Sequence, residues 1–450
     1  MSDCNNGQSL RVMDEVKRKR ILVVTYYWPP SGGAGVQRWL KFTKYLPDFG
    51  WDPIVFTPEN PDFDLKDESL LVDVNNDVEV LKFPIWEPYQ IFKKLSGNKR
   101  IQQGQILETD KKSVFKRLAI WLRGNLFVPD PRIFWVKPSV DYLTSIIQSN
   151  DIKYMITTGP PHSVHLIGKG LKLKNPTLTW VADFRDPWSQ WDILKKMKIS
   201  SFIWKRHLKL EQSVLKMADS VLATGPTAAQ EFRDLGARKV AFITNGFDAA
   251  DTTDEDLSTK RRSQFKVSHL GMLSQDRNPV VLWKVLEELC SLPAFYKVFE
   301  LHLTGILSPE VVLSIKQYPR LSTKLVLSES IPHTGVFRSN RESDVLILLQ
   351  TRAEGANSQL PGKLFEYLSA KRPVLALGAE GNDISNILDA TKAGKSFGYA
   401  EKEEIAKFLV NEFTAWQEGQ SNWTFKGVDV YERKHLTKQL DELLRSLQSK

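Results

Sequence analysis

The sequence predicts an α/β protein built from two Rossmann-like domains. Its 450 residues exceed what one hydrophobic core normally serves, which favours two domains of about 200 residues each. Short apolar runs suited to buried strands alternate with helical patterns along most of the chain. Residues 248–263 carry eight charges and little to bury, so we expect a linker there and a domain boundary near residue 255.

The composition favours an anionic partner and a reducing compartment. Hydrophobic residues make up 42% of the chain, charged residues 26%, and the formal net charge is +9. This positive charge leaves a nucleoside diphosphate, an anionic membrane face and a nucleic acid open as partners. Cys4 and Cys290 lack metal-ligand spacing and make no disulfide framework, so we expect a reducing compartment and a cytoplasmic location. No apolar run approaches the length of about 18 residues that a spanning helix needs, so any membrane contact is expected to be peripheral.

The first domain is expected to open with strand 21–27 and a glycine-rich loop. Gly32, Gly33 and Gly35 allow backbone conformations and a close approach that side chains would prevent, and a helix is expected from Val36. The spacing differs from GxGxxG, so the dinucleotide fingerprint is absent. A turn without a ligand and a loop beside a ligand both stay open at this point.

Residues 84–135 interrupt the alternation of strands and helices with aromatic and basic side chains. Within 112–123, apolar residues including Trp121 recur at helical spacing, and basic residues such as Arg123 surround them. Such a basic amphipathic helix is typical of a segment in a membrane interface and equally of one that packs on a domain core. Both interpretations stay open from the sequence.

Polar residues follow two strands of the first domain at their carboxyl ends. His162 follows strand 152–158, and strand 177–182 leads into three charged residues, Asp183, Arg185 and Asp186. Because ligands bind at the carboxyl ends of parallel strands, these side chains are candidates to face a cleft. A structural histidine and Asp–Arg pairs that brace one another are the alternatives. The other elements expected in this domain are strands 51–58, 220–224 and 240–244 and helix 207–217.

The second domain repeats the alternation, and its most informative stretch is 358–377. Pro361 and Gly362 begin a helical pattern, Lys363 lies beside the free N–H groups of its first turn, and Glu366 follows one turn on. Such a helix start binds phosphate, and an acidic side chain suits the hydroxyls of a ribose. The alternative is an ordinary amphipathic helix with both charges in solvent. The other elements expected here are strands 265–273, 299–304, 324–328 and 344–349 and helices 279–291, 383–389, 402–412 and 429–448.

Four separated segments resemble one protein family in the family's own order. They read TYYWPPSGGAGVQRWLKFTKYLPDFGWDPIVFTP at 25–58, ADFRDPW at 182–188, HLGMLSQDRNP at 269–279 and PGKLFEYLSAKRPVLAL at 361–377. In these segments the chain resembles the retaining glycosyltransferases of family four, of the bacterial polysaccharide-biosynthesis type. The resemblance implies the GT-B fold, in which two Rossmann-like domains face each other across a cleft.

This resemblance implies an acceptor-side domain at 1–255, a nucleotide-sugar domain at 256–425 and a last helical segment, 426–450, that returns to the first domain. It implies a hexosyltransferase-like enzyme that uses a nucleotide-diphosphate sugar and a sugar or lipid-linked acceptor, with no metal, no cofactor and no nucleic acid. The glycine loop would lie at the cleft, with Arg38 as a further candidate. The donor-side residues implied are Gly32, Gly33, Arg277, Ser358, Pro361, Gly362, Lys363 and Glu366, and the catalytic ones are His162, Asp183, Arg185 and Asp186.

The chain departs from the family pattern at two positions. The family presents two basic residues to the diphosphate, but Met272 stands where the first is expected, which makes Lys363 the substitute candidate. The family also carries Glu-x7-Glu, and here Ser358 replaces the first Glu, with Glu354 the nearest carboxylate upstream. Two rival functions therefore stay open: a catalytically silent GT-B protein that acts as a binding partner, and a nucleotide-sugar epimerase.

Overall fold

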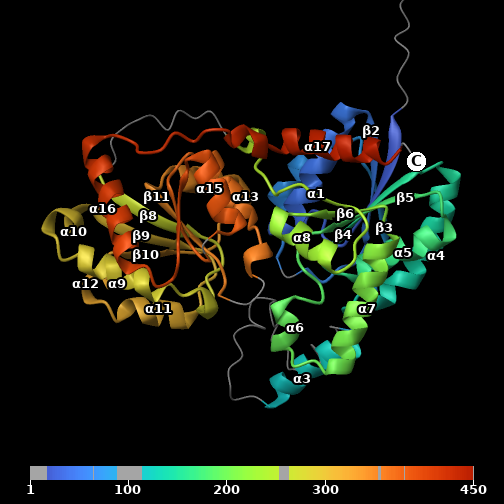
Figure 1. Ribbon diagram of the computed structural model, residues 1–450, viewed down its shortest axis with the longest axis horizontal. Helices are drawn as coiled ribbons and strands as arrows, with labels where there is room; N and C mark the ends of the chain where they lie inside the picture. Colours follow the sequence, from blue (N-terminus) through green and yellow to red (C-terminus); the bar gives the residue numbers. More distant parts are fainter. Residues whose placement is uncertain are drawn as a thin grey trace, which may run out of the picture.

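The chain forms two parallel β-sheets, each accompanied by helices, as Figure 1 shows. The computed structural model describes residues 18–63, 65–88, 114–252, 263–352, 356–379 and 381–448. The predictions that concern Lys112, Glu354 and the boundary near residue 255 lie outside these ranges. Parallel pairing on both sides of the linker is what repeated strand–helix alternation predicts.

Within the described residues, the first sheet has seven strands in the order β3-β2-β1-β4-β5-β6-β7. These are β1 (Lys19–Thr25), β2 (Trp51–Pro58), β3 (Glu79–Phe83), β4 (Tyr154–Gly159), β5 (Thr179–Phe184), β6 (Ser220–Ala223) and β7 (Val240–Phe242). The accompanying helices are α1 (Ala34–Tyr45), α3 (Val114–Leu126), α4 (Ile133–Ser149), α5 (Ser163–Lys174), α6 (Asp192–Lys196), α7 (Ser201–Met217) and α8 (Pro226–Asp234). The strand order reverses between β1 and β4, the point at which such sheets bind ligands.

The second sheet has six described strands in the order β10-β9-β8-β11-β12-β13. These are β8 (Phe265–Leu270), β9 (Phe299–Thr304), β10 (Leu325–Ser328), β11 (Val345–Leu349), β12 (Val374–Leu377) and β13 (Gly394–Phe397). Its helices are α9 (Val280–Leu289), α10 (Pro293–Val298), α11 (Pro309–Lys316), α12 (Pro319–Ser322), α13 (His333–Arg341), α14 (Gly362–Ser369), α15 (Asp383–Thr391) and α16 (Lys402–Glu418). Here the order reverses between β8 and β11, the equivalent switch point.

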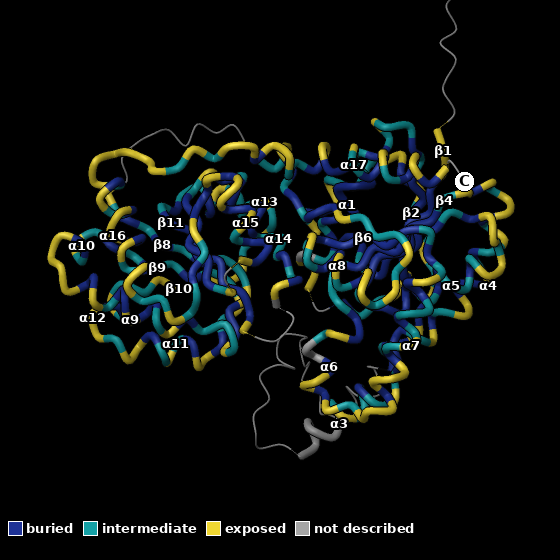
Figure 2. The backbone as a smooth tube through the Cα atoms, in the orientation of Figure 1, coloured by how far each residue is buried: buried dark blue, intermediate teal, exposed yellow. Residues whose placement is uncertain are grey.

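Continuous apolar runs explain the central strands. In β1 the four residues 21–24 are fully buried, and in β11 all five residues are buried. Parallel strands that are covered on both faces show such unbroken apolar sequences instead of alternation. Figure 2 shows buried chain in the interior of each domain. Strand β1 ends at Thr25, two residues earlier than predicted, because Tyr26 and Tyr27 contribute apolar packing beyond the strand pairing.

The last helix, α17 (Arg433–Ser446), lies on the first domain although it follows the second domain in the sequence (Figure 1). Leu436, Leu440 and Leu444 recur at helical spacing on its buried face and join the core formed with α1 and β1. The chain therefore crosses back to the first domain at its C-terminal end.

Helices α3 and α6 and the start of α7 project from the first sheet (Figure 1). Trp121 on α3 is 45% exposed and Phe202 on α7 is 73% exposed. Trp121 is therefore not a core residue. The structure describes the backbone of residues 114–119 but not their side chains. Across the described ranges, no helix has both the length and the apolar content that crossing a bilayer requires.

A buried ion pair between Arg38 in α1 and Asp183 in β5 determines how α1 lies on the sheet. The two side chains are 1% and 0% exposed, and Arg38 Nη2 lies 3.0 Å from Asp183 Oδ1. Trp39 and Thr158 also donate to this carboxylate, at 2.7 and 2.9 Å. Arg38 Nη1 donates to the carbonyl of Thr244 at 2.9 Å. The placement of Arg38 and Asp183 at a cleft is thus corrected: both lie inside the domain, where they satisfy each other.

Replacing Asp183 with alanine should destabilise the first domain by about 3–5 kcal/mol, because Arg38 would stay buried without its counter-charge. Urea unfolding monitored by tryptophan fluorescence measures this. Asp141→Ala, which removes the exposed partner of Lys174, serves as the control and should shift the transition little. An unchanged unfolding midpoint for Asp183→Ala would contradict the bracing role.

Candidate functional site

A cavity of about 540 Å³ lies between the two domains. The second domain contributes strand ends and the start of α14, and the first contributes the glycine loop and α1. A cavity of this size is within the range that holds a small ligand such as a nucleotide. Its wall includes three cations, one carboxylate and two glycines that expose the backbone: Arg277, Lys363, Arg433, Glu366, Gly33 and Gly362.

Two cations face this cavity from the second domain. Lys363 has no hydrogen bond or ion pair within the described residues, and Nε of Arg277 is buried without a hydrogen-bond partner there. The Lys363 ammonium lies against Gly271, where an added Cβ would be 2.9 Å from Nζ. Burial and the charge of Arg277 lower the pKa of Lys363 to about 8. Unpaired cations held close together in this way provide a site for an anion.

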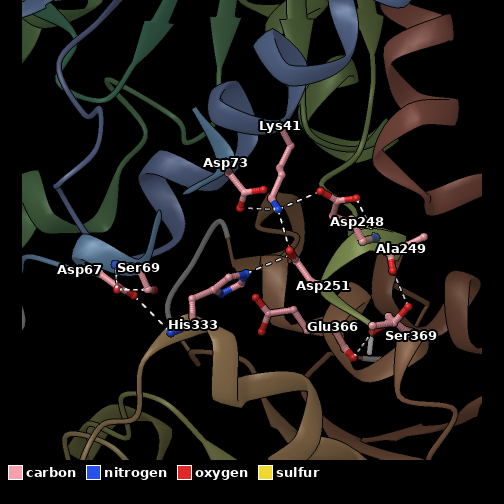
Figure 3. A network of polar contacts seen from close by, with 12 residues as sticks. Lys41, Asp67, Ser69, Asp73, Asp248, Ala249, Asp251, His333, Glu366 and Ser369 are labelled. Carbon is pink, nitrogen blue, oxygen red and sulfur yellow. Dashed lines mark hydrogen bonds and ion pairs between the residues drawn. The ribbon is translucent and has the colours of Figure 1, made fainter. Parts of the chain in front are cut away.

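The start of α14 faces the same space. Pro361 is the N-cap residue and offers no side-chain hydrogen bond, so the first N–H groups of the helix stay available. A Cβ at Gly362 would meet no atom within 4 Å, so the helix start is open. Glu366 lies one turn further on, lines the cavity and, in Figure 3, points into it. The helix start, two cations and a carboxylate therefore share one cavity.

His333 connects the two domains at the edge of this cavity (Figure 3). Its backbone N–H donates to Asp67 at 3.2 Å, and its Nε2 lies 3.2 Å from Asp251. Burial alone would lower the pKa of His333, but the hydrogen bond to Asp251 and the charge of Glu366 raise it overall, against the repulsion of Lys41. The second domain is thus tied to two acidic residues of the first.

An acidic cluster beside His333 has its own cationic partner. Carboxylate oxygens of Asp73, Asp248 and Asp251 lie within 4.8 Å of one another, a spacing that a metal ion could use. The ammonium of Lys41 lies between them, at 2.7, 2.8 and 2.7 Å respectively. Figure 3 shows this arrangement. Lys41 therefore takes the central position itself, and Lys44 offsets further negative charge by pairing with Asp73 and Asp248 at 2.7 and 2.9 Å.

The other predicted donor residues divide into two groups. Gly33 lines the cavity with a φ of 87°, a left-handed conformation that favours glycine. Gly32 packs against Leu65, whose side chain would lie 2.9 Å from an added Cβ. Ser358 is buried and hydrogen-bonds Glu231 of α8 in the first domain. Ser358 is absent from the cavity wall, so the position where the family has its first Glu serves here as an interdomain contact.

The predicted catalytic residues do not meet Lys363 in one cavity. His162 lines a separate cavity of about 100 Å³ in the first domain together with Tyr27, Trp188 and Trp191. Its ring stacks on Trp188 at 4.9 Å with an interplanar angle of 2°. Burial, followed by the charges of two neighbouring histidines, lowers the pKa of His162 well below its ordinary value, so the imidazole is neutral at pH 7.

Arg185 links the two cavities through backbone contacts. Its guanidinium donates to the carbonyls of Gly35 and Gly159, at 2.6 and 3.2 Å, and to that of Pro160. Gly35 lies against Tyr27 of the smaller cavity, two residues after Gly33 of the larger one. Burial raises the pKa of the adjacent Asp186. Arg185 thus holds the loops of three strand ends together.

Sequence reasoning missed three residues that shape the interdomain cavity. His333 and Asp67 were not singled out, although His333 follows a strand at its carboxyl end, which is a usable signal. Arg433 opens an amphipathic helix in which six of fourteen residues are charged, and a charged residue at such a helix start is usually in solvent. Its place in the cavity wall arises only from the return of α17 to the first domain.

No protein-family model and no curated protein sequence matches the chain. Several solved structures resemble it along nearly its whole length. A sucrose-phosphate synthase from Thermosynechococcus elongatus has a TM-score of 0.61 at 14% identity, covering 96% of this chain and 100% of that one. The Anabaena protein HepE in complex with UDP-glucose has a TM-score of 0.62 at 14% identity, covering 95% and 99%.

A protein from Listeria monocytogenes assigned as a UDP-N-acetylglucosamine 2-epimerase has a TM-score of 0.55 at 11% identity, covering 96% and 97%. Identities this low establish the fold alone. The chain has the GT-B fold, with two Rossmann-like domains, as predicted.

Affinity for a nucleoside diphosphate should be full below pH 7 and fall as the pH rises through about 8, because Lys363 loses its proton with a pKa of about 8. Isothermal titration between pH 7 and 9.5 measures this. In Lys363→Arg the side chain stays protonated, so the decline should disappear. An identical decline in that variant would assign the pH dependence to another group.

Proposed function

We propose that the protein is a retaining glycosyltransferase that moves a sugar from a nucleotide-sugar to an acceptor hydroxyl in the assembly of a cell-surface polysaccharide or glycolipid. The observation that carries the proposal is the unpaired pair Lys363 and Arg277 beside the open start of α14 and the carboxylate of Glu366. This set matches a diphosphate followed by a ribose. The complex of HepE with UDP-glucose, a protein of the same fold, supports it.

On the donor side, the C1–O bond of the sugar would break as the nucleoside diphosphate leaves. Lys363, Arg277 and the α14 N–H groups would neutralise the charge that develops on the leaving phosphate. The acceptor hydroxyl would attack C1 from the same face and give its proton to that phosphate. This route needs no protein nucleophile and places the rate enhancement in positioning and electrostatics.

On the acceptor side, the first-domain cavity supports binding of an acceptor sugar. Trp191, which is partly exposed, offers a flat face for a sugar ring, and the neutral imidazole of His162 can exchange a hydrogen bond with a hydroxyl. Arg185 would hold the loops on either side of the transferred sugar in register. Asp183 would contribute through Arg38 and the position of α1.

Ser358 keeps the two rival functions open, because it offers the donor sugar no carboxylate. A catalytically silent binding protein would hold the nucleotide-sugar without turnover. An epimerase, the activity assigned to one protein of the same fold, would convert the nucleotide-sugar into its epimer without an acceptor and without net release of nucleoside diphosphate. Transfer requires that release depend on the acceptor.

Release of nucleoside diphosphate should therefore be measurable only when an acceptor is present. The donor for this assay is identified by mass spectrometry of the nucleotide-sugar that the purified protein retains.

Arg277→Ala and Lys363→Ala should each weaken nucleoside diphosphate binding by about 1.5–3 kcal/mol, because each removes a charge-assisted contact. Arg338→Ala, an exposed arginine of α13, is the control. Unchanged affinity in both site variants would refute the phosphate assignment, and conversion of the nucleotide-sugar into its epimer without net release of nucleoside diphosphate would favour the epimerase.

We further propose that α3 brings the protein to the cytoplasmic face of an anionic membrane, where a lipid-linked acceptor would be found. Trp121 is exposed, and each Lys or Arg near an anionic leaflet contributes about 1 kcal/mol. The protein should sediment with anionic vesicles at low salt and be released at high salt. Trp121→Ala and Arg123→Glu should weaken sedimentation.

Arg238→Glu is the matched control for that experiment, because it changes the net charge equally on an exposed turn elsewhere in the first domain. It should reduce sedimentation less than Arg123→Glu. Equal losses in the two variants would indicate attraction by overall charge, and no sedimentation at low salt would make a soluble acceptor the better proposal.

A further inference from the structure

Arg433 is a buried cation whose guanidinium has no hydrogen bond or ion pair within the described residues. It is the first residue of α17, its side chain is 4% exposed, and it lines the interdomain cavity. Its Nη1 is buried without a hydrogen-bond partner, and no ion pair involves it within the described residues. A buried charge left in this state is costly, so a partner from outside the chain is expected.

The carboxylates near Arg433 differ in whether they are already engaged. Burial and the charge of Arg38 lower the pKa of Arg433 to about 9, whereas Glu366, Asp248 and Asp251 raise it. Asp248 and Asp251 are held by Lys41 at 2.8 and 2.7 Å. The Glu366 carboxylate forms no hydrogen bond or ion pair within the described residues. Glu366 and Arg433 thus share the cavity wall as an unengaged acceptor and an unengaged donor.

The chemistry of this pair selects the kind of group that can bind it. A carboxylate only accepts hydrogen bonds and a guanidinium only donates them. A phosphate would meet the cation but be repelled by Glu366. Hydroxyl groups both donate and accept, so two adjacent hydroxyls satisfy both side chains without adding charge. The cations proposed for the phosphates come from other positions: Lys363 lies one helical turn before Glu366 on α14, and Arg277 lies in the turn that follows β8.

We propose that Arg433 and Glu366 together bind the ribose diol of the donor nucleotide, Glu366 from the second domain and Arg433 from the helix packed on the first. This assignment rests on the proposed function, since it requires a nucleotide in the cavity. It adds that the ribose touches groups held by both domains. A charged donor and a charged acceptor therefore recognise the 2′-hydroxyl. A 2′-deoxyribonucleotide should bind much more weakly than the matching ribonucleotide.

The test compares ribonucleoside diphosphates with their 2′-deoxy counterparts by isothermal titration, using the ADP, GDP, CDP and UDP pairs. The unaltered protein should prefer the ribonucleotide of its best pair by about 10- to 100-fold, the value of one or two hydrogen bonds to charged groups. In Arg433→Met, which keeps the volume and removes the charge, this preference should fall at least tenfold. The affinity for the 2′-deoxy compound should change much less.

Two variants separate this role from a structural one. Arg445→Met lies on the same helix with an exposed side chain, and it should leave the preference unchanged. In Glu366→Gln with Arg433→Met, the loss of preference should be smaller than the sum of the single losses, because both act on one diol. The melting temperature of Arg433→Met should not fall, since an unpaired buried charge is removed.

Binding with an unaltered ribose preference in Arg433→Met would overturn this assignment and leave the proposed function intact. Failure of the unaltered protein to bind any of the nucleoside diphosphates would overturn both.

Discussion

The ion pair between Arg38 and Asp183 is the interaction on which the arrangement of the cavity depends. Arg38 belongs to α1, Asp183 belongs to β5, and Arg38 also binds the carbonyl of Thr244 at the start of the segment that leads to the second domain. One guanidinium thus fixes the helix after the glycine loop relative to the sheet and to the interdomain segment. Because neither charge is tolerated alone inside the domain, few other arrangements of these elements are available.

Burial and pairing decide which cations remain for a ligand. Arg38 and Lys41 both lie at 1% exposure, but Asp183 neutralises the first and three carboxylates neutralise the second. Lys363 is partly buried, Arg433 is 4% exposed, and neither has such a partner in the described chain. Lys363 and Arg433 are therefore cations that stay available to a ligand, and both line the interdomain cavity.

Polar contacts hold the domains together around that cavity. His333 binds Asp251, and Asp383 of α15 accepts hydrogen bonds from the N–H and the hydroxyl of Thr227 at the start of α8. Ser358 adds its contact to Glu231. Such contacts are weaker than an apolar interface and can be exchanged with water, which suits a site that must admit and release a ligand. The replacement of a family carboxylate by Ser358 thus has a consequence for domain contact as well as for sugar binding.

Local chemistry was sufficient to predict the two-domain α/β fold, the glycine loop and a helix that starts at Gly362. Strand periodicity, the free N–H groups of a helix start and the position of Lys363 one residue into it are properties of short segments, so they can be read in order along the chain. Short segments could not predict three other features: the partners of Asp183, the exposure of Trp121 and the contact of Ser358. Each depends on an element more than seventy residues away or on solvent. Arg433 is the clearest case, because only the return of α17 across the first domain turns a residue of a charged helix into part of the cavity wall.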